Sequence, residues 1–328
     1  MSRTQTTLLG LLLLQIVLIV FFRSPLSGPS TRSESRPLLP ELEALSAERL
    51  QIDGASDERI TLVRRGEEWT IDEIGGFPAD SDKVVRLLES LEGIQVRRPL
   101  VSSSSYHDAF KVTSGDHEAR LQVWGTGDDA PVVDLILGSS ANYRTTHARL
   151  GGQDEVYEIQ GLAPYDVQAA QASWIHKELA DDVGEVTSLR LRNAAGRFEL
   201  ERREGLWQVS SPVDRLGETL NQESVLELLR AVTGLRLSDA VGPLDETLHG
   251  FDSPAATLEL AWSSGRPGEE ESGAGELSVL IGGKVPDQDQ QRYVTRGGSG
   301  FTGTIWETSL ERLLDDSLDD LRAEADTE

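Results

Sequence analysis

An internal duplication constrains this chain more than any other feature. The segment 198–234 can be matched with an earlier segment, 60–93, because both run through two short apolar-alternating stretches, a tryptophan, an amphipathic stretch and a final glycine. The numbering differs by 138 between Trp69 and Trp207 and by 141 between the two final glycines, so only the loop between the matched blocks differs in length. The sequence therefore predicts two copies of one structural unit.

Each copy is expected to open with a hairpin and a helix. Apolar and polar residues alternate on both sides of Gly66 and of Gly205, which is typical of a hairpin with one buried face. Apolar residues at helical spacing then predict helices over 84–91 and 225–232. Good N-cap residues precede both helices, and the glycine after each is expected to adopt the left-handed conformation of a C-terminal cap.

More strands follow in each copy. They are predicted at 50–52, 119–124, 132–137, 143–147 and 156–159 in the first copy, and at 189–191, 257–262, 277–281, 292–295 and 304–306 in the second. Each copy is expected to close on an amphipathic helix, at 164–172 and 310–321. Strands grouped around one or two helices, with short connections, favour the α+β class with mainly antiparallel sheets.

The predicted organisation is two tandem repeated domains, at 45–180 and 181–322, followed by an acidic tail at 323–328. Trp69 and Trp207 occupy matching places on the inner faces of the two hairpins. Ligand stacking is the alternative role for such residues, but matching places in both copies favour two core residues.

The amino terminus carries a charge-free apolar stretch, Leu8–Phe22. Counted from Thr6, a helix here would be about 26 Å long, near the lower limit for spanning a bilayer. A cleaved signal peptide is the alternative, but the stretch lacks the small-x-small cleavage site. We therefore expect a transmembrane anchor at 1–23 and, because 24–44 is rich in Ser and Pro, a tether after it.

Charge alone leaves the orientation of this anchor open. Arg3 precedes the span, whereas Arg23, Arg32 and Arg36 follow it, so the positive-inside rule does not decide the matter. Long domains translocate largely regardless of their charge. We expect the folded body to face away from the cytoplasm.

Composition limits the partners. The chain has 328 residues, a formal charge of −25 and no cysteine. Nucleic acid and anionic membrane surfaces repel such a body, and a disulfide-linked partner is excluded. Basic ligands and basic protein surfaces remain possible partners.

No recognisable catalytic, cofactor-binding or metal-ligating motif is present. The five histidines are His107, His117, His147, His176 and His249. None forms the pairs at helical spacing that bind zinc. His107 and His249 each stand just before a phenylalanine, so we interpret them as turn residues in matching places.

Three other stretches contain residue types that catalytic or phosphate-binding sites use. Gly282–Lys284 lacks the first glycine and the following Ser or Thr of a phosphate-binding loop. The serine run 102–105 lacks the glycines of a nucleophile elbow, and Glu269–Glu271 is a solvated charge run. The sequence thus predicts no site residue and no cofactor.

Several of these features together resemble a known family. They are a strand–turn–strand with an inward tryptophan, a helix with paired leucines, a Leu-x-Ile-Gly … Tyr-Val strand pair, and the closing segments 174–179 and 317–322, which resemble an Asp-Leu-Arg motif. The chain resembles the bacterial family called domain of unknown function 4340, in two tandem copies over about residues 45–322. The resemblance implies a single-anchored envelope protein, associated with ABC transport systems of the gliding-motility auxiliary type. It implies no activity for any residue.

The apolar amino terminus and the repeated units predict a non-enzymatic accessory protein that is anchored in a membrane, has its body outside the cytoplasm and binds protein partners. The resemblance implies that this membrane is the bacterial inner membrane, with the body on the periplasmic side, and that the partners belong to a transport assembly. One alternative is an extracytoplasmic module that holds a small molecule or glycan between its two domains. Another is a hydrolase that uses carboxylates outside any recognised motif.

Overall fold

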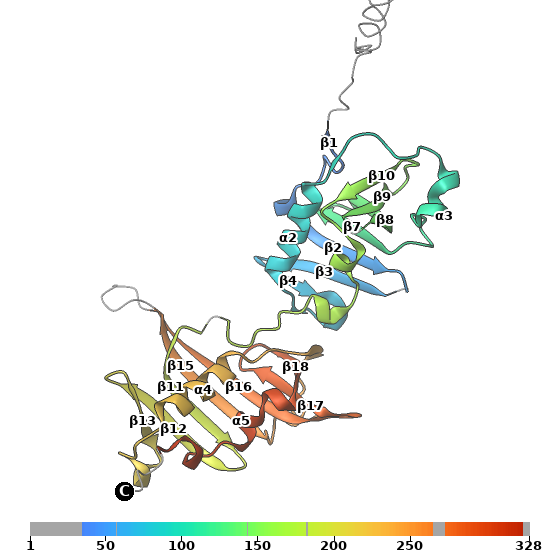
Figure 1. Cartoon of the computed structure of the whole chain (residues 1–328). Coiled ribbons are helices and arrows are strands. Elements are labelled where there is room, and N and C mark those ends of the chain that lie inside the picture. The colour runs from blue at the N-terminus through green and yellow to red at the C-terminus, as the bar shows by residue number, and fades with distance from the viewer. Residues whose placement is uncertain (1–34, 57, 143, 182, 265–272, 324–328) are drawn as a thin grey trace, which may run out of the picture.

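The computed structural model describes residues 35–323, apart from residues 57, 143, 182 and 265–272. The described chain forms two eight-stranded sheets, one after the other along the sequence, and a two-stranded ribbon (Figure 1). The expected anchor at 1–23 lies outside the described residues. Among the described residues, no helix is both long enough and apolar enough to cross a membrane.

Every strand pair in the first sheet is antiparallel. Its strands are β2 (Ala47–Gly54), β3 (Arg59–Arg65), β4 (Glu68–Ile71), β5 (Phe77–Pro78), β7 (Ala119–Gly125), β8 (Val133–Asn142), β9 (Thr145–Leu150) and β10 (Val156–Gln160). They are ordered β10-β9-β8-β7-β2-β3-β4-β5.

The second sheet is also antiparallel throughout. Its strands are β11 (Glu185–Asn193), β12 (Gly196–Arg203), β13 (Leu206–Ser211), β14 (Asp239–Pro243), β15 (Ala256–Ser264), β16 (Gly273–Val285), β17 (Gln288–Arg296) and β18 (Phe301–Trp306). They are ordered β13-β12-β11-β15-β16-β17-β18-β14.

The two sheets share one strand order. Seven strands, β4-β3-β2-β7-β8-β9-β10, follow the same chain path as β13-β12-β11-β15-β16-β17-β18. The sheets differ at their edges, where β5 is added to the first and β14 to the second. The expected α+β architecture of two repeat-like units with mainly antiparallel sheets is therefore confirmed.

One helix of three turns packs on each sheet. In α2 (Ser81–Glu92) and α4 (Gln222–Thr233), the apolar stripe predicted from the sequence is buried. Gly93 and Gly234 end these helices with φ of −73° and −90°, so the predicted left-handed cap is wrong. A glycine fits there for a different reason: a Cβ on Gly234 would lie 2.9 Å from the carbonyl oxygen of Arg230.

The two tryptophans are buried, as predicted. Trp69 is 2% exposed and Trp207 is 4% exposed. Each backbone N–H donates to the side chain of the first residue of the helix, at 2.9 Å to Ser81 Oγ and at 2.8 Å to Gln222 Oε1. The same contact therefore joins hairpin and helix in both units, although the accepting residue differs.

Closing segments return to the helix start in both units. The N–H of Asp80 donates to the carbonyl of Trp174 at 2.8 Å, and the N–H of Asn221 donates to the carbonyl of Leu321 at 2.9 Å. Because Asp80 and Asn221 also cap the helices, each closing segment fixes the point where its helix begins.

The predicted closing helices are wrong in extent. Residues 164–172 form 3₁₀ turns at Pro164–Val167 and Gln171–Ser173, and 310–321 contains only α5 (Glu311–Asp315) and a final 3₁₀ turn. The backbone is extended at Asp316, and the next residue, Ser317, donates its N–H to Asp320 Oδ2 at 2.8 Å. Such local side-chain bonds compete with helix continuation.

The predicted tether at 24–44 is wrong for its described part. Arg36–Pro37 forms β1 and pairs with β6 (Gln95–Val96). Leu38, Leu39 and Leu42 are at most 5% exposed. This part belongs to the first unit, because three leucines within five residues bury apolar surface against its core.

Candidate functional site: an acidic cleft between the two sheets

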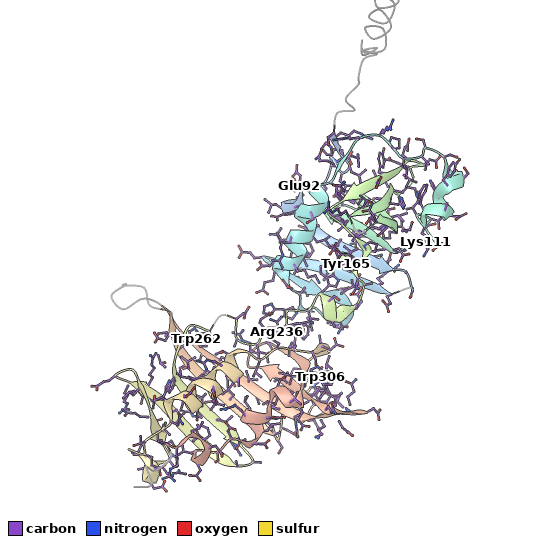
Figure 2. The ribbon with its side chains drawn as sticks, viewed as in Figure 1. Glu92, Lys111, Tyr165, Arg236, Trp262 and Trp306 are labelled. Atoms are coloured by element: carbon purple, nitrogen blue, oxygen red, sulfur yellow. The ribbon has the colours of Figure 1, made fainter. Side chains whose placement is uncertain are left out.

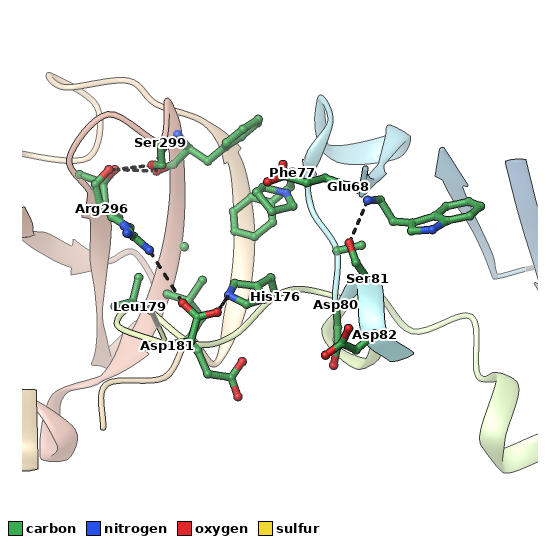
Figure 3. Close-up of a pocket in the computed structure, with 18 of the residues that line it drawn as sticks. Glu68, Phe77, Asp80, Ser81, Asp82, His176, Leu179, Asp181, Arg296 and Ser299 are labelled. Atoms are coloured by element: carbon green, nitrogen blue, oxygen red, sulfur yellow. Dashed lines mark hydrogen bonds and ion pairs between the residues drawn. The ribbon is translucent and has the colours of Figure 1, made fainter. Parts of the chain in front are cut away.

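A cleft of about 960 Å³ lies between the two units. The first unit contributes the β4–β5 edge of its sheet and the amino-terminal turn of α2. The second unit contributes the turn between β17 and β18, and the connecting segment 176–181 crosses the space between them (Figure 3). The cleft walls therefore come from three parts of the sequence that are far apart.

Direct contacts between the units hold this geometry. The rings of Phe77 and Phe301 meet edge to face, with centroids 5.4 Å apart. Gln171 of the first unit donates its Nε2 to the carbonyl of Ala240 in β14 at 2.8 Å. Gly75 packs closely on Pro243 at the end of β14, since a Cβ on this glycine would lie 2.9 Å from the proline ring.

The cleft is strongly acidic. Its lining holds six carboxylates and two guanidinium groups, which leaves a formal charge of −4 with His176 neutral. Three of the carboxylates, on Glu67, Glu68 and Asp82, are exposed and make no side-chain hydrogen bond or ion pair with another described residue. Their negative potential is therefore directed into the cleft and the solvent.

The other carboxylates of the cleft have structural partners. Asp80 Oδ1 accepts from the N–H of Lys83 at 2.8 Å and so caps α2. Glu178 Oε1 lies 2.5 Å from a guanidinium nitrogen of Arg236. These contacts stabilise the helix start and the connecting segment.

Asp181 joins the connecting segment to the second unit. Its Oδ2 lies 3.0 Å from His176 Nε2, and its Oδ1 lies 3.9 Å from Arg296 Nη1 (Figure 3). The backbone N–H of His176 in turn donates to the carbonyl of Pro78 in β5 at 3.0 Å. His176 and Asp181 thus lie where both units and the connecting segment meet.

His176 is the one histidine of the sequence that lines this cleft. The sequence pattern predicted that His107 and His249 occupy matching places in the two units, and this prediction is wrong. In the first unit the N–H of Val112 donates to the carbonyl of His107, and in the second that of Phe251 donates to the carbonyl of Glu246. This register matches His107 with Glu246 and matches His249 with Phe110.

A pair of aromatic side chains occurs at the same place in both units, where the segments 107–112 and 246–251 pack on their sheets. Phe110 and His147 lie 4.6 Å apart between ring centroids, and His249 and Tyr293 lie at the same distance. The histidine of the pair therefore comes from a sheet strand, β9, in the first unit and from the loop between β14 and β15 in the second. His249 is 4% exposed and shares a 3.0 Å hydrogen bond between its Nδ1 and Thr302 Oγ1, so it packs a loop onto the sheet.

Gly282–Lys284, the stretch that was compared with a phosphate-binding loop, has a packing role in the structure. Gly282 passes so close to the loop carrying His249 that a Cβ would lie 2.2 Å from the carbonyl oxygen of that histidine. Lys284 Nζ lies 3.0 Å from Glu307 Oε2. The serine run 102–105 is exposed and leads into α3 (His107–Phe110), and Glu269–Glu271 lies outside the described residues.

No group of three or more potential metal ligands occurs among the described residues. Sequence reasoning missed the cleft because none of its residues belongs to a catalytic or ligand-binding motif. Clusters of acidic residues at 67–68 and 80–82 were a signal in the sequence, but only folding brings them opposite 176–181 and 294–303.

Residues 69–254 match the family model described as "Domain of unknown function (DUF4340)". This stretch covers more than half of the chain. The chain belongs to this family. The matched stretch begins in β4 of the first unit and ends just before β15 of the second. Comparison with curated proteins and with solved structures found no match.

Proposed function

We propose that this DUF4340 protein is a non-enzymatic interaction protein, held by an amino-terminal membrane anchor on the periplasmic side of the bacterial inner membrane. Its two units are two tandem copies of the family's domain. The shared strand order and the repeated contact between hairpin and helix support this, and so does the closing segment that returns to each helix start. The family resemblance supports the partner assembly, an ABC-type transport system.

The cleft between the units receives a positively charged segment of the partner protein. The observation that carries this proposal is the cleft's charge, with Glu67, Glu68 and Asp82 unpaired along one wall. Complementary charge speeds encounter and selects the partner. The ring pair of Phe77 and Phe301 adds apolar surface on which the stems of lysine or arginine side chains can pack.

The two alternatives fit the cleft less well. Its volume of 960 Å³ is at the upper end of small-molecule sites, and eight charged side chains line its walls. A carboxylate-dependent hydrolase needs one acid and one base free to meet the substrate. Asp80 and Asp181 are instead held by the helix cap and by the contacts of the connecting segment.

Photo-crosslinking in cells tests the proposal with the full chain in its own membrane. A photoreactive amino acid replaces Glu68 in the cleft or, as the control position, Glu204 on the far hairpin of the second unit. We expect a discrete adduct from position 68 and none from position 204. The cleft triple variant Glu67→Gln, Glu68→Gln, Asp82→Asn is then combined with a crosslinker at position 299, on the opposite wall.

This triple variant should lose the adduct from position 299. A charge-matched triple variant, Glu204→Gln, Glu311→Gln, Asp315→Asn, should keep it, because these three residues are exposed outside the cleft. Equal adducts in the two triple variants would refute recognition through the charge of the cleft. Adducts from position 204 equal to those from position 68 would refute the cleft as the binding face.

A further inference from the structure

A second cavity, of about 500 Å³, lies on the outer face of the second sheet. It is formed over β14, β18 and β17, beside the tip of the β16–β17 hairpin. Its lining includes two aromatic rings, two amides and two hydroxyls, on Trp306, Tyr293, Gln288, Gln291, Ser238 and Thr304. The charged side chains of Lys177 and Asp239 also line it. The strand register places Gln291 opposite Trp306 and Tyr293 opposite Thr304, so these side chains share one face.

Trp306 differs from the other tryptophans of the chain. It is 49% exposed and lies at the end of β18, whereas the other five are at most 9% exposed (Figure 2). A large aromatic side chain left half in solvent gains little from packing.

The duplication shows that the fold does not require a tryptophan there. In the first unit β9 and β10 pair Thr145 with Gln160, and in the second β17 and β18 pair Gln291 with Trp306. Since His147 matches Tyr293 in the repeated aromatic pair, Gln160 is the counterpart of Trp306. A polar residue therefore completes the same strand in the first unit, and Trp306 serves a purpose specific to the second.

Gln291 has an unused hydrogen-bond donor in this cavity. The residue is 9% exposed, and its Oε1 accepts from Ser238 Oγ at 3.5 Å. Its Nε2 has no hydrogen-bond partner among the described residues. Solvent in the cavity reaches this Nε2, so it can donate a hydrogen bond to a ligand that enters.

We propose that this cavity binds a saccharide. A pyranose ring has an apolar C–H face, which stacks on an aromatic side chain such as Trp306. Its hydroxyls lie around the ring edge, where they donate to and accept from side-chain amides and hydroxyls such as those of Gln288, Gln291 and Ser238. The volume falls within the ~300–1,000 Å³ of small-molecule sites and leaves room for more than one sugar unit.

Iodide quenching of tryptophan fluorescence gives a direct assay on the full chain in detergent. Iodide reaches exposed tryptophans, so the quenchable signal comes chiefly from Trp306. The probes are glucose, galactose, mannose and N-acetylglucosamine, each also as a short oligomer. We expect at least one probe to protect this signal saturably. Co-sedimentation with purified peptidoglycan is a separate arm, which distinguishes a wall polymer from a free sugar as the ligand.

Variants are measured by saturation-transfer NMR, which does not depend on Trp306. Trp306→Gln introduces the residue of the first unit and should weaken binding about tenfold or more, whereas Trp306→Phe should keep part of it. Gln291→Met removes the amide and should also weaken binding. Leu248→Gln is the matched control: it removes an exposed apolar side chain outside the cavity, and binding should not change.

Two results would overturn the proposal. One is that no sugar probe protects Trp306 and no peptidoglycan co-sediments. The other is that binding is unchanged in both Trp306→Gln and Gln291→Met. Neither result bears on the charged cleft between the units, since the two cavities share no lining residue.

Discussion

Replacing Trp69 with alanine should destabilise the first unit by several kilocalories per mole. The residue is 2% exposed and its side chain belongs to the core beneath α2. A buried aromatic of this size removes about 150–250 Å² from water, which at about 25 cal/mol per Å² corresponds to about 4–6 kcal/mol. Alanine keeps a little of this burial, and measured losses for such replacements are about 3–5 kcal/mol.

That loss is a large share of the stability of a domain, about 5–15 kcal/mol. Urea unfolding followed by circular dichroism measures its size. Hydrogen exchange shows where the loss occurs. Strands β2 to β10 should exchange faster, while β11 to β18 keep most of their protection, because each helix packs on the sheet of its own unit. Trp207→Ala should give the reverse pattern.

Trp306→Ala is the matched control for both variants. This tryptophan is 49% exposed, so its removal should change the free energy of unfolding by at most about 0.5 kcal/mol. A change below about 1 kcal/mol for Trp69→Ala would show that the residue does not support the core, and the assignment of the inner face of the hairpin would be wrong.

Three further predictions concern packing, pH and the membrane. Gly282→Ala should destabilise the second unit by about 1–3 kcal/mol in thermal unfolding, because its Cβ would lie 2.2 Å from a carbonyl oxygen, whereas Gly115→Ala, in open space, should not. Hydrogen bonds from two cationic side chains lower the pKa of Glu307 below its ordinary 4.5. Its stabilising contribution is therefore complete above that value and is lost as the pH falls through the lower folded-state pKa, so the advantage in urea stability of the wild type over Glu307→Gln at neutral pH should shrink as the pH falls below 4.5. The full chain should sediment with membranes, deletion of residues 1–23 should release a soluble folded body, and a carboxyl-terminal alkaline phosphatase fusion should be active where a green fluorescent protein fusion is dark.

Contrary results would be equally specific. Equal melting of the two glycine variants would contradict the close approach of the loop to β16. A pH-independent difference for Glu307→Gln would show that its charge is not what stabilises. A mature amino terminus beyond residue 23 would refute the anchor, and a fluorescent fusion with a silent phosphatase would reverse the topology.

Recognition of the repeat from the sequence depended on local patterns. The alternation around Gly66 and Gly205 and the apolar stripes of α2 and α4 are set by side-chain geometry within one strand or one helical turn. Residues a few positions apart therefore reveal them. The core positions of Trp69 and Trp207 followed from the same patterns, and the structure confirms them.

Local patterns failed where long-range contacts decide the structure. Leu38, Leu39 and Leu42 stand in a polar stretch, and only the first unit's core makes them interior residues. The helices expected at the ends of the two units have the right apolar spacing, but the closing segments must reach the starts of α2 and α4. That path breaks them into short turns.

Local patterns were enough to predict the two repeat-like units, their hairpins and helices, and their buried tryptophans, because periodicity of side chains is a property of neighbouring residues. The cleft and the cavity beside Trp306 exist only once the chain is folded. Glu68, Asp82 and Asp181 carry no motif, and Gln291 looks like any surface glutamine in the sequence. Their chemistry arises from the packing of one unit against the other and from the pairing of β14 with β18, which join residues far apart in the chain.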